Sequence, residues 1–432
     1  MSQNRPGQTI LRARIVLPGP GPAIVNGAVA VSGNRITAVE KWSRVEAGQA
    51  EVIDLGDAIL MPGLVNAHCH LDYSGMAGLI PPPRKFVDWL KLITTNKSGL
   101  IYSDFAEAWL TGAKMLLTTG TTTVGDIEMV PELLPDVWSA TPLRVLSCLE
   151  MTGVKSRRPP PEILGEALDK IASLPAGRSF GGLSPHAAYS TTTELLRLTG
   201  ETARKKKLRL VTHVSESEEE FEMFVKGRGG MFEWLALSGR DMSDCAHGSP
   251  VRALERASFL GENLLAVHVN HLAPGDSRLL GRHDVSVVHC PRSHTYFKHA
   301  TFPLAELTTA GVNICLGTDS LASVYKPRKK PVELNLFEEM REFAHKNPAV
   351  TAKTIFRMAT DNGARALGLA GQIGELRPDA FADLIAIPFA GKTADVFDIV
   401  LNHRGNLLAS MIDGHWAIAP GETARQASTG LA

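Results

Sequence analysis

Two histidines separated by one residue end an apolar run in the stretch ILMPGLVNAHCHLDYSG. Alternate side chains of a β-strand lie on one face, so His68 and His70 point the same way and could bind one ion together. A lone His-x-His pair is equally consistent with two polar residues at a strand exit. A metal site is favoured because His213, His268 and Asp319 each end a further apolar run. Imidazole and carboxylate groups suit a catalytic zinc or iron(II) ion that leaves one position open for water.

A carboxylic acid, Glu216, stands three residues after His213. A bound dication lowers the pKa of water from about 16 to about 7 and so supplies a nucleophile for hydrolysis. Hydrolytic deamination of a heteroaromatic ring also needs an acid that protonates a ring nitrogen, and a proton for the departing ammonia. We expect Glu216 to make both transfers, while Asp319 and His268 share the base role toward the water. The alternative for Glu216 is a solvated acid of the SESEEE run, which is what we expect of the glutamates at 218–220.

The composition is typical of a globular enzyme. The 432 residues are 44% hydrophobic and 21% charged, and 45 basic residues balance 45 acidic ones. This balance argues against nucleic acid or an anionic membrane as the main partner. The start of the chain has no apolar leader pattern and no window is long enough to span a membrane, so we expect a cytoplasmic location. The five cysteines are scattered without a C-x-x-C pair, which indicates reduced packing residues rather than disulfides or a cysteine zinc site.

The central block must position these side chains. It alternates apolar runs with amphipathic segments; in KFVDWLKLI, for example, Phe86, Trp89, Leu90 and Ile93 have helical spacing. We count eight such runs: AILMPGLVNAHCH, TTTVGDIEM, LRVLSCLEM, FGGLSPHAAY, LRLVTHVSE, LLAVHVNHL, VSVVHCP and VNICLGTDS. Eight strand–helix units predict an α/β fold, a closed (β/α)8 TIM-like barrel, whose catalytic groups come from the C-terminal ends of its strands. The second run ends in the less certain Asp126.

Both ends of the chain carry short β-rich runs broken by turn residues. We expect residues 1–60 and 369–432 to pair into one small β-sandwich domain. The metal-dependent barrel would then occupy residues 61–368, ending with the helical stretch at 351–368.

The motifs at the run ends resemble those of the amidohydrolase superfamily: PGLVNAHCHLD, THVSESEEE, VHVNHL, HCPRS and LGTDSLAS. The resemblance covers nearly the whole chain and implies a metal-dependent barrel beside a β-sandwich built from both termini. Position by position, it assigns the ligands of one metal ion to His68, His70, His213 and Asp319. It places His268 at the metal and its water. Two-metal members carry a lysine at the fourth strand end, where this chain offers His186, so we expect one divalent ion, zinc, with iron as the alternative.

Within the superfamily, His-x-x-Glu with CPRS and GTDSLAS is most similar to the branch that deaminates 5'-modified adenine nucleosides to hypoxanthine products. The implied small-molecule substrates are aminodeoxyfutalosine, S-adenosylhomocysteine, methylthioadenosine or adenosine, and HLDYSGMAGLIPPPRKFVDWL is most similar to the aminodeoxyfutalosine members. Guanine- or cytosine-type deaminases and triazine hydrolases are alternatives within the superfamily. A barrel that has lost catalysis and serves as a binding or assembly protein is an alternative of another class, which the complete ligand set disfavours. A homodimer would be unsurprising, although no motif encodes the oligomeric state.

Substrate contacts follow from the same resemblance. His186 resembles a fourth-strand histidine that contacts substrate, against the alternative of a core histidine. Asp88, in FVDWL, resembles an acid that binds ribose hydroxyls. The alternative is an acid on the surface of a helix. His271 lies three residues after His268, so on a strand it should face the opposite way, and we expect it to be structural.

The seventh run and two loops supply the remaining candidates. His289 is expected to line the site from the seventh strand, although His294 stands where the common HCPxSN pattern has asparagine. Arg157, its neighbour Arg158, and Arg292 could clamp an anionic substrate tail through paired hydrogen bonds. Solvated loop arginines are the alternative.

Overall fold

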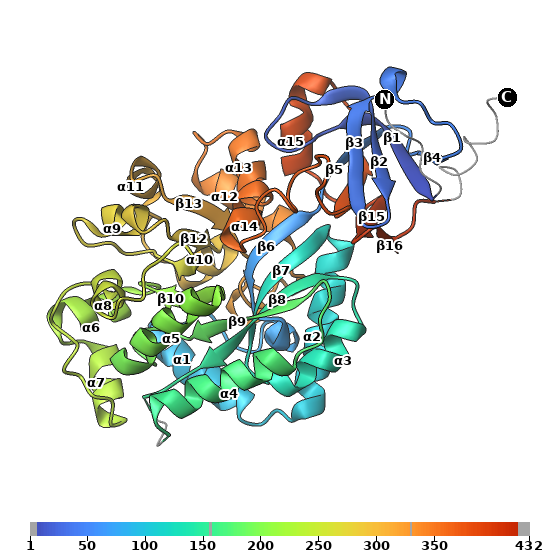
Figure 1. Cartoon of the computed structure of the whole chain (residues 1–432). Helices are drawn as coiled ribbons and strands as arrows, with labels where there is room; N and C mark the ends of the chain where they lie inside the picture. The colour runs from blue at the N-terminus through green and yellow to red at the C-terminus, as the bar shows by residue number, and fades with distance from the viewer. Residues whose placement is uncertain (1–6, 155–157, 329–330, 422–432) are drawn as a thin grey trace.

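The predicted barrel is confirmed in the computed structural model, which describes residues 7–154, 158–328 and 331–421 (Figure 1). Eight parallel strands follow one another in chain order: β6 (Leu64–Cys69), β7 (Thr121–Glu128), β8 (Arg144–Met151), β9 (Phe180–Pro185), β10 (Leu210–Val214), β11 (Leu264–His268), β12 (Ser286–His289) and β13 (Asn313–Leu316). The first and last strands meet where Thr318 N donates to His68 O at 3.0 Å. The end of the eighth predicted run therefore lies beside the end of the first.

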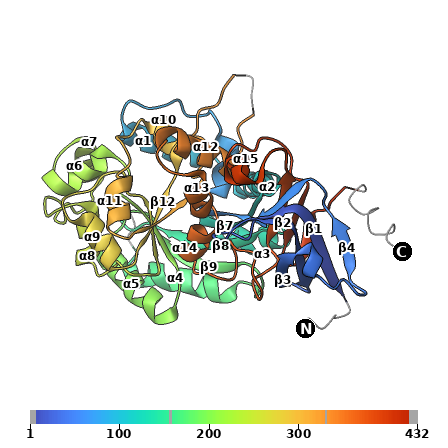
Figure 2. The same ribbon diagram turned by 90° about the horizontal axis from the view of Figure 1, so that it is seen from above.

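Helices surround the barrel, and the mixed sheet lies to one side of it when the molecule is seen from above (Figure 2). The helices are α1 (Phe86–Lys97), α2 (Tyr102–Thr118), α3 (Leu134–Ser139), α4 (Pro160–Ser173), α5 (Thr193–Lys206), α6 (Glu218–Lys226), α7 (Gly230–Leu237), α8 (Pro250–Arg256), α9 (Asp276–Arg282), α10 (Pro291–Phe297), α11 (Leu304–Thr309), α12 (Leu336–Lys346), α13 (Ala352–Met358), α14 (Asp361–Ala366) and α15 (Val396–Leu401). The helical spacing at 86–93 is confirmed in α1, which buries Phe86, Leu90 and Ile93. In the part of the chain that the structure describes, no helix has both the length and the apolar character needed to cross a membrane.

An apolar cluster fills the barrel, and the strand positions that form it show which residues at the rim also face inward. Leu146 and Cys148 of β8 and Val211 of β10 belong to this cluster. Because alternate residues of a strand share a face, Glu150 and His213 continue these rows into the barrel mouth. All five cysteines are buried free thiols, which confirms their predicted packing role.

Both chain ends build a second, mixed sheet, as the sequence predicts. Its order is β16 (His415–Ile418), β15 (Ala409–Ile412), β14 (Leu384–Pro388), β5 (Ala58–Pro62), β1 (Gln8–Val16), β2 (Ile24–Ser32) and β3 (Arg35–Lys41), with β4 (Glu51–Asp54) paired to β1. The antiparallel pair β5–β14 joins the two ends of the chain. Only Gly63 separates β5 from β6, and an ion pair of 2.9 Å between Arg144 and Asp383 fastens β8 to this sheet. The predicted domain limits at 60 and 368 stay a prediction.

Candidate metal centre and catalytic cavity

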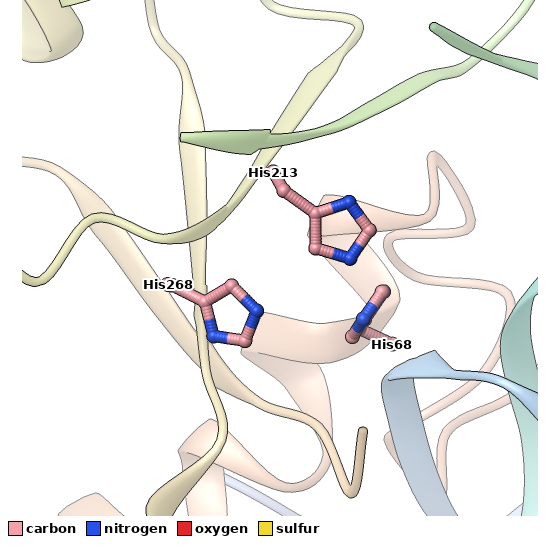
Figure 3. Close-up of side chains that lie close together, drawn as sticks. All are labelled: His68, His213 and His268. Carbon is pink, nitrogen blue, oxygen red and sulfur yellow. The ribbon is translucent and has the colours of Figure 1, made fainter. Parts of the chain in front are cut away.

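The predicted metal ligands converge at the C-terminal end of the barrel. His68, His213 and His268 come from β6, β10 and β11, and their rings lie close together (Figure 3). Oδ1 of Asp319 lies 3.7 Å from Nε2 of both His68 and His70. One ligand atom from each member of the trio His68, His213 and His268 lies within 4.8 Å of the others, and the same holds for His68, His70 and Asp319.

This donor set fits a divalent metal ion. Both ring nitrogens of His68 are buried and lack a hydrogen-bond partner among the described residues, which is costly for a polar side chain unless a ligand satisfies it. Nε2 of His70 lies 3.4 Å from Nε2 of His213, and a shared cation would satisfy both atoms. Three imidazoles and a carboxylate around such a point are typical of zinc and iron(II) sites.

The protonation states also suit metal binding. Burial lowers the pKa of His213 to about 3, with His186 and His68 adding to the shift. Burial also lowers the pKa of His70 and of His268 well below the usual range. These imidazoles are therefore neutral at neutral pH, the form that binds metals. Burial alone would raise the pKa of Asp319, but the surrounding histidines hold it well below its usual range.

Further hydrogen bonds orient the ligands. Nδ1 of His213 lies 2.9 Å from the carbonyl oxygen of His186 and must donate its proton there, which leaves Nε2 for the ion. Oδ2 of Asp319 accepts hydrogen bonds from Ser293 at 2.6 Å and from Ser323 at 3.0 Å. His268 and Asp319 both have positive φ, +75° and +54°. Such strained backbone in non-glycine residues often accompanies functional sites.

Glu216 lies beside this cluster. Its Oε1 is 3.5 Å from Nε2 of His268, and its side chain is buried. Burial raises the pKa of Glu216 well above the usual range, and the nearby Asp319 and Glu220 add to the shift. A carboxyl group that keeps its proton near neutral pH can act as a general acid.

A cavity of about 250 Å³ opens at the cluster. The helix α1 lines it along its whole length, with Phe86, Trp89, Ile93 and Lys97. The remaining wall includes both polar groups and aromatic rings: Glu150, Thr152, His186, Tyr73, Tyr189 and Trp234. A cavity lined by aromatic side chains and by Glu216 suits a flat ring with polar edges.

Comparison with known proteins agrees with this geometry. The sequence model of the Amidohydrolase family matches residues 59–417, a range that includes all eight barrel strands. The chain belongs to the amidohydrolase family.

The relatives of this amidohydrolase include deaminases. It is 30% identical over 397 residues to the 5-methylthioadenosine/S-adenosylhomocysteine deaminase of Syntrophobacter fumaroxidans, covering 84% of this chain and 80% of that protein. An adenosine deaminase from Xanthomonas campestris, solved with bound zinc, matches with a TM-score of 0.81 and 24% identity over 97% of this chain and 96% of that one. The Helicobacter pylori aminofutalosine deaminase, solved with methylthio-coformycin, matches with a TM-score of 0.83 and 19% identity over 95% and 100%. At these identities the solved structures show the shared fold.

Not all predicted substrate contacts lie at the cavity of this amidohydrolase. His186 lines it, and its Nδ1 lies 2.7 Å from Oγ of Ser190. Asp88 is exposed on α1, on the side away from the cavity, and lies 3.9 Å from Lys91. Its predicted contact with ribose finds no support in this placement, because the helix turns Phe86, Trp89 and Leu90 toward the cavity instead.

The other candidates that the structure describes also lie outside the cavity. His289 stacks on Phe302 with ring centroids 4.0 Å apart and lines a different hollow. Arg292 pairs with the buried Glu339 at 2.5 Å, which makes it a structural partner rather than a clamp facing the cavity. Arg158 forms an ion pair with Glu166, and Arg157 lies outside the described residues.

His271 and His294 have contacts of their own. His271 packs near Phe221, and both ring pairs that it forms lie away from the metal ligands, in keeping with its predicted structural role. His294 approaches Oδ1 of Asn270 with its Nδ1 at 3.0 Å. The sequence left the role of His294 open, and this contact links it through Asn270 to the cavity residue Glu216.

The prediction that Glu220 is a solvated acid is wrong. Its side chain is fully buried, and its two carboxylate oxygens accept hydrogen bonds from the backbone N–H groups of Ser215 and Glu216. The sequence carries a signal for this, because Ser217 and Glu220 have the S-x-x-E spacing in which the fourth residue reaches back past the helix start. The cavity residues Lys97 and Glu150 were also missed, since neither belongs to a motif.

Proposed function

We propose that this amidohydrolase is a metal-dependent deaminase that acts on 5'-modified adenine nucleosides. The observation that carries the proposal is a buried Glu216, 3.5 Å from His268 and inside a cavity that also holds Asp319. Membership of the family and the names of its relatives support the same class of reaction. The reaction would add water to the amino-bearing ring carbon and release ammonia, leaving the hypoxanthine product.

One divalent ion, zinc in our proposal, would be held by four side chains: His68, His70, His213 and Asp319. His268 would complete the site beside the attacking water. Bound there, the ion supplies Lewis acidity, which brings the pKa of water into the neutral range.

Proton transfer would be the task of the protein side chains. Burial raises the pKa of Glu216 and so favours its protonated form, which would donate the proton to a ring nitrogen and make the adjacent carbon open to attack. A carboxylate oxygen of Asp319, held away from protonation by its histidine neighbours, would accept a proton from the attacking water. Glu216 would then take the hydroxyl proton of the addition intermediate and pass it to the amino group, so that ammonia leaves as the carbonyl forms. The proton taken up by Asp319 would return to Glu216 and restore both groups.

The remaining cavity would receive the rest of the nucleoside. The adenine would lie near Glu216, and the 5' substituent would extend toward Lys97 and Glu150, which lie at the last turn of α1 and the end of β8. Lys97 donates to the hydroxyl of Tyr73 at 3.0 Å. Among the described residues, no hydrogen bond or ion pair engages the Glu150 carboxylate. This charged end favours a polar 5' group over the bare hydroxymethyl of adenosine.

The test is ammonia release by the metal-loaded protein with adenosine, methylthioadenosine, S-adenosylhomocysteine, aminodeoxyfutalosine, guanine and cytosine. We expect a 5'-modified adenine nucleoside to give the highest kcat/KM. Turnover of guanine or cytosine alone would mean that the substrate is one of these bases and not an adenine nucleoside. No turnover with metal bound would overturn the proposed deaminase activity. The cytoplasmic location and the homodimer stay predictions from the sequence.

A further inference from the structure

We propose that Glu220 and Asn270 are positioning residues that clamp the backbone of Glu216 from two sides, with His294 fixing the orientation of Asn270. The inference depends on the proposed function only through the catalytic role given to Glu216. Neither residue touches the space in which a substrate would lie, since the cavity lining includes neither.

One side of the clamp is the carboxylate of Glu220. Its oxygens accept hydrogen bonds from Ser215 N at 3.0 Å and from Glu216 N at 2.8 Å. Ser215 has a φ of +49°, so the chain turns sharply here and presents two consecutive N–H groups to one carboxylate. Ser217 caps the helix α6 by accepting from Glu220 N at 3.1 Å, which fixes the start of Glu220's side chain.

The other side of the clamp is Asn270. Its Nδ2 donates to the carbonyl oxygen of Glu216 at 2.9 Å, and its backbone N donates to Ser215 O at 3.0 Å. Since Nδ2 is the donor, Oδ1 must accept, and Nδ1 of His294 donates to it at 3.0 Å. The chain of hydrogen bonds thus runs from α10 through the end of β11 to the peptide of Glu216.

The arrangement fixes the position of the proposed proton donor, Glu216, relative to His268. Asn270 follows His268 by two residues, and both His268 and the intervening Val269 have positive φ, +75° and +49°. The same short segment therefore carries one contact to the side chain of Glu216 and another to its backbone. A displacement of about 1 Å at such a site can reduce turnover by about 100-fold.

Burial of Glu220 is costly, which argues that its position serves a purpose. Burial raises the pKa of Glu220 to about 7, although the backbone N–H groups of residues 215–217 lower it. Its neighbour Glu218, in the same first turn of α6, is exposed. Glu218 is therefore a matched control that changes the same functional group without touching the clamp.

The experiment compares Glu220→Gln and Asn270→Ala with the control Glu218→Gln in the full-length, metal-loaded protein. Glu220→Gln retains one acceptor oxygen and turns an amide NH2 toward a backbone N–H, while Asn270→Ala removes the donor to Glu216 O. We expect both clamp variants to lose kcat by about 10- to 100-fold with KM changed less than about threefold, and to keep their metal. In a Glu216→Gln background, Glu220→Gln should cause no further loss, because both act through one residue.

Amide hydrogen exchange gives a readout that does not depend on turnover. The amides of residues 215–216 should exchange at least about tenfold faster in Glu220→Gln than in the parent and in Glu218→Gln. Unchanged exchange and unchanged kcat in both clamp variants would overturn the proposal, as would an equal further loss of turnover in the Glu216→Gln background. If the parent shows no deaminase activity while exchange still accelerates, the clamp stands and the proposed function fails.

Discussion

Oε1 of Glu216 lies 3.5 Å from Nε2 of His268. Burial raises the pKa of the carboxyl and lowers that of the imidazole, so it favours the uncharged form of both groups. It therefore favours a proton on Glu216 before substrate binds. This is the state required of a group that must donate a proton to a ring nitrogen.

Removing this proton should abolish most turnover. Glu216→Gln keeps the shape of the side chain but cannot exchange a proton, so we expect kcat/KM for the best substrate to fall by about 1000-fold with metal content unchanged. Ammonia release and metal analysis on the same sample measure both quantities. Near-normal turnover in the variant would remove Glu216 from the proton-transfer step.

Ser293 should control metal affinity without being a ligand. Its Oγ donates to Oδ2 of Asp319 at 2.6 Å, and removing such a partner typically weakens metal binding by about 10- to 100-fold. We expect this loss for Ser293→Ala in competition with a chelator. Ser173→Ala, at an exposed position of α4, is the control. Equal affinities in the two variants would mean that the hydrogen bond does not support the metal site.

Glu150 should select the 5' group. If its carboxylate meets the ammonium of S-adenosylhomocysteine, Glu150→Gln should reduce kcat/KM for that substrate by about tenfold or more, the usual effect of losing a charge-assisted hydrogen bond. The uncharged 5' group of methylthioadenosine should be affected less than about threefold by the same change. Glu162→Gln, exposed on α4, is the matched control. An equal loss for both substrates would place Glu150 away from the 5' substituent.

Arg292 should matter for stability rather than for substrate affinity. Its partner Glu339 is fully buried, so Arg292→Met leaves a buried carboxyl that has lost its ion-pair partner and keeps only the backbone N–H of residue 292. The change should cost about 3 kcal/mol of unfolding free energy. Adding Glu339→Gln should restore part of this loss, because no charge then remains buried. Chemical denaturation of the single and double variants measures the effect. A raised KM with unchanged stability would instead support the predicted clamp.

The stability contribution of Asp126 should depend on pH. Burial raises its pKa from 3.8 to about 7, although the hydrogen bonds from Leu71 N and Trp109 Nε1 oppose the shift. Between these two values the folded state holds a proton that the unfolded state has released. The unfolding free energy relative to Asp126→Asn should therefore be largest near pH 4 and fall as pH rises to about 7.

Urea unfolding of the two metal-free proteins at several pH values between 4.5 and 8 tests this expectation. The difference between them should decline with pH and then level off. A difference that stays constant, or that grows with pH, would contradict a raised pKa at this position.

The eight-strand barrel, and the end of it that carries the candidate site residues, could be predicted from local sequence. Apolar runs that each end in a polar residue indicate parallel strands, and parallel strands place their carboxyl ends at one rim. His68, His213, His268 and Asp319 are such run ends, so their convergence follows from strand order alone. Pairing of the two chain ends into one sheet was likewise visible as similar short β runs.

Only the tertiary structure decided which of the other polar groups belong to the cavity. Asp88 and Trp89 are neighbours in sequence, yet the rotation of α1 turns one toward solvent and the other toward the cavity. Glu220 looks like one more charge in an acidic run, and its burial arises because the chain turns at Ser215 and offers it two N–H groups. Local periodicity fixes where a strand ends, whereas these contacts depend on helix rotation and loop path, which are set by packing between segments far apart in the chain.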